Sequence, residues 1–337
     1  MRNFIFLLVV VILAGCWDSK EINNFSYVLG IGIDRTDSGE IQLTYQIADL
    51  KQEGETKNIT ATGKSFAEAQ RKINSMSGKE VNLEQTRVIV LGEILVSQDI
   101  SEFMQSAFRD LHIRSSTPVT IAKGTAADVL ELKTDMFVDL TANNEAVLTD
   151  SNILDITKNI WQQSDYLIQI TERTEAGFEI VGGAIFRENK MVGILPLENI
   201  ADYKLLTHGM KRIGMDIELE GVDVVLQGIS TKTEAILQGD SPKMKIEITG
   251  KYSIEEKEYI DDEVYLEKID KLLNDNITNK CQEVIEIGQK QTGADFLGFW
   301  RKFKNQHRPW WDKEGTHWRE ILPSVPIEIN VNIRRVS

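Results

Sequence analysis

Apolar residues along this chain change their spacing several times, and each spacing predicts a different element. In the first third of the chain, short apolar runs typical of strands are separated by segments of helical spacing. Strands are predicted at residues 26–33, 41–48, 59–62, 86–91 and 118–123. A capping box that begins at Ser65 starts a helix over 65–75, and a second helix is predicted at 99–111. These strands are too short and interrupted for a large parallel sheet.

The pattern becomes more regular in the second half of the chain. A hairpin is predicted at 184–195, and a strand-rich stretch runs from 215 to 255. An amphipathic helix follows at 263–291, with Cys281 on its apolar stripe. The final segment, 325–334, alternates apolar and polar residues as a strand with one buried face does. The intervening residues 134–175 have a weak pattern that predicts only a helix at 152–164.

The first fifteen residues carry an export pattern. Arg2 supplies a positive charge, residues 4–13 are all apolar, and small residues precede Cys16. Ten apolar residues are too few to span a bilayer, which needs about 20. The pattern predicts a signal peptide over residues 1–15 that is cleaved between Gly15 and Cys16.

The sequence Leu13-Ala14-Gly15-Cys16 resembles the lipobox of bacterial lipoproteins. The resemblance implies that the Cys16 thiol receives a diacylglycerol and that the new amino group can also be acylated. Two acyl chains, each contributing about 0.8 kcal/mol per buried CH2, would anchor the protein durably on the extracytoplasmic face of a membrane. Residues 16–25 are then the lipidated tether. An ordinary secretory signal followed by a chance cysteine is the alternative.

Composition narrows the class of protein further. The chain has 337 residues and a formal net charge of −14, with 42% hydrophobic and 27% charged residues. This is the composition of a globular protein, and an acidic chain with no basic face is not a nucleic-acid-binding protein. Cys281 is the only cysteine besides Cys16, which excludes a disulfide framework.

These patterns predict an α+β fold of several modules, each a mainly antiparallel sheet with packed helices, after a lipoprotein signal peptide. We divide the chain into an N-terminal α+β region over residues 26–180, made of one or two modules, and a C-terminal α+β domain over 181–337. The C-terminal domain contains the long helix at 263–291.

No catalytic or metal-binding constellation is present in the sequence. Gly63-Lys64-Ser65 lacks the first glycine of a phosphate-binding loop, because that position is Asn58. Gly30-Ile31-Gly32 lacks the third glycine of a dinucleotide fingerprint, and we expect these glycines to permit a close approach by another segment. The four histidines do not have the spacing of metal ligands. We therefore expect no catalytic residues, no metal and no cofactor.

Four of the six tryptophans gather near the C-terminus, at Trp300, Trp310, Trp311 and Trp318. Two interpretations are open. The rings form the core beneath the helices that cover the C-terminal sheet, or some of them are exposed as a docking patch for a membrane partner. Basic residues interleave with the rings, and this stripe would face acidic partner loops or anionic headgroups. The basic residues are Arg301, Lys302, Lys304 and Arg308.

Several motifs in order resemble the Ger(x)C family, the lipoprotein C subunits of nutrient germinant receptors in endospore-forming bacteria. The motifs are Cys16-Trp17-Asp18 leading into Val28–Asp34, Gly183-Ala184-Ile185-Phe186, Ala294–Phe299, the tryptophans 310, 311 and 318, and Val331–Arg335. The resemblance covers essentially the whole chain. Trp300 departs from it, since a small residue is more usual there.

The resemblance implies a lipid-anchored, non-enzymatic subunit of a membrane germinant receptor complex that is required for spore germination. It implies two integral-membrane partner subunits and a location at the spore inner membrane. The alternative is a solute-binding lipoprotein of a transporter, which predicts two α/β lobes with repeated strand–helix alternation and a cleft between them. The strand-rich stretch at 215–255 argues against that alternative.

Overall fold

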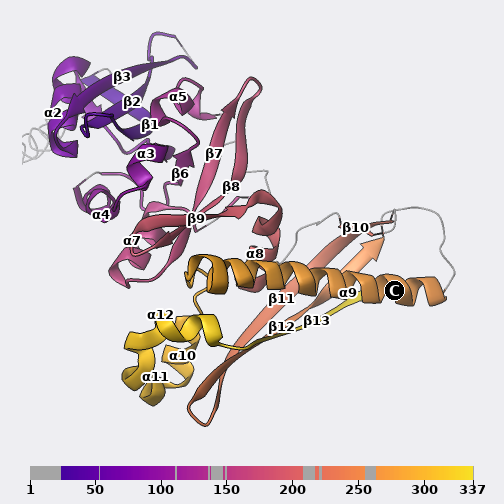
Figure 1. Ribbon diagram of the computed structural model, residues 1–337. Helices are drawn as coiled ribbons and strands as arrows, with labels where there is room; N and C mark the ends of the chain where they lie inside the picture. Colours follow the sequence, from indigo (N-terminus) through magenta and orange to yellow (C-terminus); the bar gives the residue numbers. More distant parts are fainter. Residues whose placement is uncertain are drawn as a thin grey trace, which may run out of the picture.

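The computed structural model describes residues 24–52, 54–110, 112–135, 137, 147–148, 150–207, 217–219, 222–254 and 263–336. The predicted signal peptide, its cleavage site at Gly15, the lipidation site Cys16 and nearly all of the tether lie outside these residues. The described residues form two sheets with helices packed on them, as Figure 1 shows. No helix in these ranges is long and apolar enough to cross a bilayer.

The first sheet has nine strands within the described ranges, in the order β3-β2-β1-β5-β6-β7-β8-β9 with β4 beside β1. Its strands are β1 (Phe25–Arg35), β2 (Ile41–Ala48), β3 (Thr56–Gly63), β4 (Glu80–Asn82), β5 (Val88–Leu91), β6 (Val119–Ala122), β7 (Tyr166–Thr174), β8 (Gly177–Arg187) and β9 (Lys190–Pro196). The ladders from β1 through β5 and β6 to β7 are parallel, and β4 also pairs with β1 in parallel. The ladders at both ends of the sheet are antiparallel.

Helices cover both faces of the centre of this sheet. The helices of this half are α2 (Phe66–Ser77), α3 (Glu93–Val96), α4 (Ser101–Asp110), α5 (Ala126–Val129) and α7 (Ile153–Trp161). Ile89 and Leu91 of β5 belong to the main core of this half, whereas Val88 and Val90 pack on the other side with α5. Side-chain caps define the first turns of α2 and α7. The side chain of Ser65 accepts a hydrogen bond from Glu68 N, and that of Asn152 accepts one from Asp155 N.

Gly30 and Gly32 of β1 lie directly beneath the segment that follows α5. A Cβ atom at Gly32 would lie 2.9 Å from Cδ1 of Leu130, and one at Gly30 would lie 2.8 Å from Cδ2 of the same residue. The close approach expected from the sequence is therefore made by this segment of the chain itself.

The second sheet has the order β10-β11-β12-β13 within the described ranges. Its strands are β10 (Ile217–Leu219), β11 (Val222–Gln238), β12 (Ser241–Ile254) and β13 (Ile327–Arg335). The long β11–β12 hairpin is antiparallel, and β13 joins β12 in parallel. In Figure 1 the long helix α9 (Glu263–Glu286) lies along this sheet. Cys281 is fully buried on α9, and burial raises the pKa of its thiol.

The remaining helices connect the two sheets. They are η3 (Leu197–Asn199), α8 (Ile200–Thr207), the π-helical turn η4 (Ile287–Thr292), α10 (Phe299–Gln306), α11 (Arg308–Glu314), η5 (Gly315–His317), α12 (Trp318–Ile321) and η6 (Leu322–Ser324). The core of the second sheet continues through α8 onto Leu167 of β7 and Ile185 of β8. The amide of Gln289 donates to the carbonyls of Leu322 and Val325, and so holds η6 against the end of α9.

The α+β class is confirmed, and antiparallel pairing predominates along the long hairpins. Two details differ from the prediction. Strand β7 was not predicted. The strands of residues 26–180 belong to one sheet, within the one or two modules that the sequence left open. The four central strands β1, β5, β6 and β7 pair in parallel although β5 and β6 are short, because pairing between distant segments, rather than strand length, sets the order of the sheet. The division near residue 180 stays a prediction. Residue 180 lies inside β8, and the first sheet continues across it.

Candidate functional site

A buried carboxylate organises the aromatic helices. Asp295 precedes α10, and its Oδ1 accepts a hydrogen bond from Phe299 N at 2.8 Å. Its Oδ2 accepts hydrogen bonds from Trp300 N at 2.7 Å and from the indole Nε1 of Trp318 at 2.8 Å. Burial raises the pKa of Asp295 to about 7, although these three donors oppose the shift. The carboxylate thereby fixes the start of α10 against α12.

A second carboxylate joins this unit to the first sheet. Asp165, immediately before β7, accepts a hydrogen bond from Asp295 N at 2.7 Å. Arg319 of α12 lies 3.5 Å from Asp165 and 2.8 Å from Glu188, and so links α12 to the start of β7 and to the β8–β9 turn. The aromatic helices are therefore held to the first sheet by polar contacts through Asp165 and Arg319.

Arg301 of α10 connects the aromatic helices to α7 of the first half. Its Nη2 donates to Asn159 Oδ1 at 2.5 Å and to Gln162 Oε1 at 3.2 Å. Its guanidinium carbon lies 5.2 Å from the centre of the Trp300 ring. Arg301 is one of the basic residues that the sequence analysis placed on an exposed stripe, and the structure instead uses it at the contact between the two halves.

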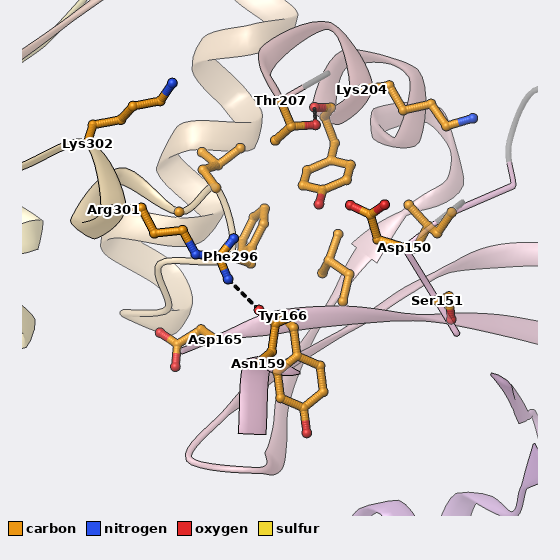
Figure 2. Close-up of a pocket in the computed structure, with 15 residues that line it drawn as sticks. Asp150, Ser151, Asn159, Asp165, Tyr166, Lys204, Thr207, Phe296, Arg301 and Lys302 are labelled. Carbon is orange, nitrogen blue, oxygen red and sulfur yellow. Dashed lines mark hydrogen bonds between the residues drawn. The ribbon is translucent and has the colours of Figure 1, made fainter. Parts of the chain in front are cut away.

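Two hollows flank this contact. The first, here called the junction pocket, has a volume of about 220 Å³ and lies between β7, α8 and the residues before α10. Figure 2 shows Arg301 and Asp150 on opposite sides of it, with the Phe296 ring between them and the Lys204 and Lys302 side chains directed away.

The second hollow, here called the aromatic groove, has a volume of about 570 Å³. Its walls include the rings of Trp300, Trp311 and Trp318 together with Lys304, Thr316 and Arg319. Asp165 lines both hollows. The two hollows therefore adjoin at the side chain of Asp165.

The four clustered tryptophans fall into two groups. Trp310 and Trp318 are 7% and 6% exposed, and both pack on Phe303 in the core of the second sheet. The indole nitrogens of both are satisfied, that of Trp310 by the carbonyl of Asp240. Trp300 and Trp311 are only half-buried and line the groove, with ring centres 6.0 Å apart. The core interpretation describes the first pair, and docking through the second pair stays a prediction.

The other candidate motifs have structural roles in this fold. Ser65 caps α2, as predicted. His307 Nε2 lies 2.8 Å from the carbonyl of Ala235. Within the described ranges, no group of His, Cys, Asp or Glu side chains is arranged to hold a metal ion.

Four buried acids were not expected from the sequence: Asp34, Asp165, Asp202 and Asp295. Asp34 accepts hydrogen bonds from the backbone nitrogens of Ala126 and Ala127 at 2.7 and 3.0 Å, and so caps α5. The chain has 52 acidic residues, so an acid in the sequence carries no sign that it is buried. A carboxylate just before a helix is the one local signal that was available, at Asp295.

Comparison with known families gives matches over nearly the whole chain. The family described as "Spore germination protein N-terminal domain" matches residues 18–168. The family described as "Spore germination B3/ GerAC like, C-terminal" matches residues 181–336. The gap between the two matches lies at β7 and β8, close to the division proposed from the sequence.

Individual relatives match end to end at low identity. Spore germination protein B3 of Bacillus subtilis (strain 168) is 22% identical, over 99% of this chain and 96% of the relative. Spore germination protein GerQC of Bacillus cereus is 23% identical, over 99% of this chain and 97% of the relative. The crystal structure of the GerBC protein has the same fold, with a TM-score of 0.65 at 21% identity over 95% of this chain and 100% of that one.

Proposed function

This chain belongs to the Ger(x)C family of spore germination proteins, and on that premise we propose that it is a lipid-anchored, non-enzymatic subunit of a membrane germinant receptor. The observation that carries the proposal is the match to both family domains in a chain that has Cys16 directly after an apolar export segment. We propose that two integral-membrane subunits are its partners and that it lies on the extracytoplasmic face of the spore inner membrane.

The alternative of a solute-binding lipoprotein has less support. That function favours two α/β lobes with repeated strand–helix alternation. Here β11 and β12 form one long antiparallel hairpin in place of such alternation.

The anchor and the function are tested together in the native host. We expect Cys16→Ala to abolish incorporation of labelled palmitate and to release the protein from the membrane fraction, because the variant lacks the acylated thiol. Ser19→Ala, three residues further along the tether, is the matched control and should keep the label. Both the Cys16→Ala and deletion strains should fail to germinate with some nutrients, yet respond to a trigger that bypasses nutrient receptors.

Two results would contradict the proposal. Full palmitate labelling of the Cys16→Ala variant would contradict the proposal that Cys16 carries the lipid anchor. The proposed receptor role would be contradicted if the deletion strain germinated normally with every nutrient and if no integral-membrane partner co-purified with the protein.

A further inference from the structure

Strand β13 is the last strand of the second sheet, and its ladder with β12 decides which of its backbone groups point outward. Met244 N donates to Pro326 O at 2.9 Å, and Val336 N donates to Tyr252 O at 2.8 Å. The residues that bond to the neighbouring strand alternate along a parallel strand, so the even-numbered residues of β13 bond to β12. The N–H and C=O groups of the odd-numbered residues therefore point to the outer edge of the sheet.

Both ends of this outer edge are closed. Asn274 of α9 donates to the carbonyl of Ile333 at 3.1 Å and accepts from its N–H at 2.8 Å. At the start of the strand, Pro326 has no N–H, and Val325 N donates back to Leu322 O of η6. Between these ends, no hydrogen bond to the described residues occupies the outward backbone groups of three residues, here called the open edge: Ile327, Ile329 and Val331.

The side chains of the open edge are apolar and incompletely buried. All three pack on the core of the second sheet but stay half-buried, whereas Ile333 on the same face is 1% exposed. Glu328 and Asn330 alternate with them and lie on the opposite, exposed face of the strand. A strand placed beside β13 would therefore cover apolar surface on one face and meet polar side chains on the other.

The other described sheet edges are shielded or short. At β3, Lys72 of α2 donates to the carbonyl of Thr62 at 2.8 Å. At β9, Thr292 of η4 lies so close to Gly193 that a Cβ atom there would come within 2.8 Å of it. Strand β10 has only three residues. Among the described strands, β13 is therefore the one whose edge is most open to another strand.

We propose that the open edge pairs with the same edge of a second copy of this chain, antiparallel and about a two-fold axis at Ile329. In this register Ile329 faces Ile329 of the second copy, and Ile327 faces Val331 of the second copy. Each facing pair exchanges both of its backbone hydrogen bonds, because the outward groups of both strands lie at these residues. The interface is isologous, and this inference goes beyond the proposed function.

The register is complementary on both faces of the extended sheet. Apolar side chains face apolar side chains on the side of α9. On the exposed face, Glu328 lies opposite Asn330 of the second copy, at non-hydrogen-bonded positions where side chains approach most closely. The amide of Asn330 donates to Glu328 within one strand at 3.0 Å, and across the axis the same donor and acceptor face each other.

The two closed ends exclude the neighbouring registers. A shift of two residues in one direction would pair Ile327 with Ile333, whose backbone groups are bonded to Asn274. A shift of two residues in the other direction would pair Val331 with Val325, whose N–H is bonded within η6. Only the register about Ile329 uses the open edge and nothing else.

The test uses two full-length, differently tagged chains that are produced together in the native host, one with Glu328→Cys and one with Asn330→Cys. We expect mild oxidation of the membranes to give a disulfide-linked dimer with at least about fivefold higher yield than either variant alone, because facing positions come within disulfide distance and diagonal ones do not. Asn332→Cys in place of Asn330→Cys is the matched control, since it lies on the same exposed face but diagonal to Glu328, and its yield should be low. Cys281 is fully buried and should not contribute.

A backbone variant separates pairing of the edge from folding. Ile329→Pro removes an outward N–H, which the fold of one chain does not use, so the melting temperature should stay close to that of Ile329→Ala. The yield of the Glu328→Cys and Asn330→Cys dimer should fall by about tenfold with Ile329→Pro, because hydrogen bonds at the axis are lost. Ile329→Ala keeps the N–H and should keep most of the yield.

Several outcomes overturn the proposal. These are equal yields from the single variants and from their mixture, a higher yield with Asn332→Cys, no dimer from folded protein, a disulfide to a different polypeptide, or full yield with Ile329→Pro. The palmitate and germination tests use none of these variants, so the pairing can fail while the receptor role stands.

Discussion

The two sheets of this protein are buried in different ways. Every residue of β5 is buried, because one face of that strand contacts the main core and the other contacts α5. Along β12, buried residues alternate with partly or fully exposed ones over Met244–Thr249, since the described helices cover only one face. Short parallel strands are stable in the first sheet because both faces are covered, whereas the long antiparallel hairpin of the second sheet tolerates water on one face. The same substitution should therefore have very different effects in the two sheets.

The largest expected effect on stability comes from a polar amide on the face of β5 that packs against α5. Val90→Asn buries an unpaired polar group and removes apolar contacts with α5, and it should lower the free energy of unfolding by about 4 kcal/mol. The matched change Thr249→Asn, on the exposed face of β12, should change it by less than about 0.5 kcal/mol. Urea unfolding of the full-length variants measures both. Equal losses would show that the two sheets do not differ in this way.

A smaller loss is expected where the cover of the first sheet touches β1. Gly32→Ala would place a Cβ atom 2.9 Å from Leu130 Cδ1 and 3.2 Å from Ala126 Cβ, and should destabilise the protein by about 3 kcal/mol. The double variant Gly32→Ala with Leu130→Ala should lose less than the sum of the two single variants, because the second change removes the clash. Additive losses in urea unfolding would mean that Leu130 does not limit the space above Gly32.

The smallest effect concerns Asp202 on α8, between the two sheets. Its side chain is 1% exposed, and within the described ranges neither carboxylate oxygen has a hydrogen-bond partner. Burial raises the pKa of Asp202 to about 6, with Lys280 of α9 opposing the shift and Glu283 adding to it. Because the folded pKa lies above the unfolded value near 3.8, this residue stabilises the fold below pH 4, and the contribution is lost as the pH rises toward 6.

Asp202→Asn removes this titration. The stability of the variant relative to the natural chain should rise by about 2 kcal/mol between pH 4 and pH 7, and most of the change should occur below pH 6. Urea unfolding across this pH range measures the difference in the free energy of unfolding. The other buried acids contribute equally to both proteins, so their titration cancels in this difference. A difference that stays constant with pH would mean that Asp202 is ionised in the folded protein at pH 4.

Local patterns predicted those elements whose determinants lie within a few residues. The capping box at Ser65, the hairpin at 184–195 and the strand predicted at 325–334, which is β13, were all confirmed. Strand β7 was missed because its apolar and polar residues do not alternate clearly. Its pairing with β6 and β8 identifies it as a strand. The candidate site followed the same rule. Clustering of tryptophans indicated the region, whereas the buried acids that organise it, Asp165 and Asp295, lie far apart in the sequence.

The family could be read from motifs in the amino-acid sequence. The α+β class and most of the helices and hairpins could also be predicted, because hydrophobic periodicity and capping act over one or two turns. Three features became visible only in the folded chain. The central strands are parallel, the first sheet continues into β9, and Trp310 and Trp318 are buried whereas Trp300 and Trp311 are half-buried. These outcomes depend on which distant surfaces exclude water from one another, and that choice is made by packing over the whole chain rather than by any local run of residues.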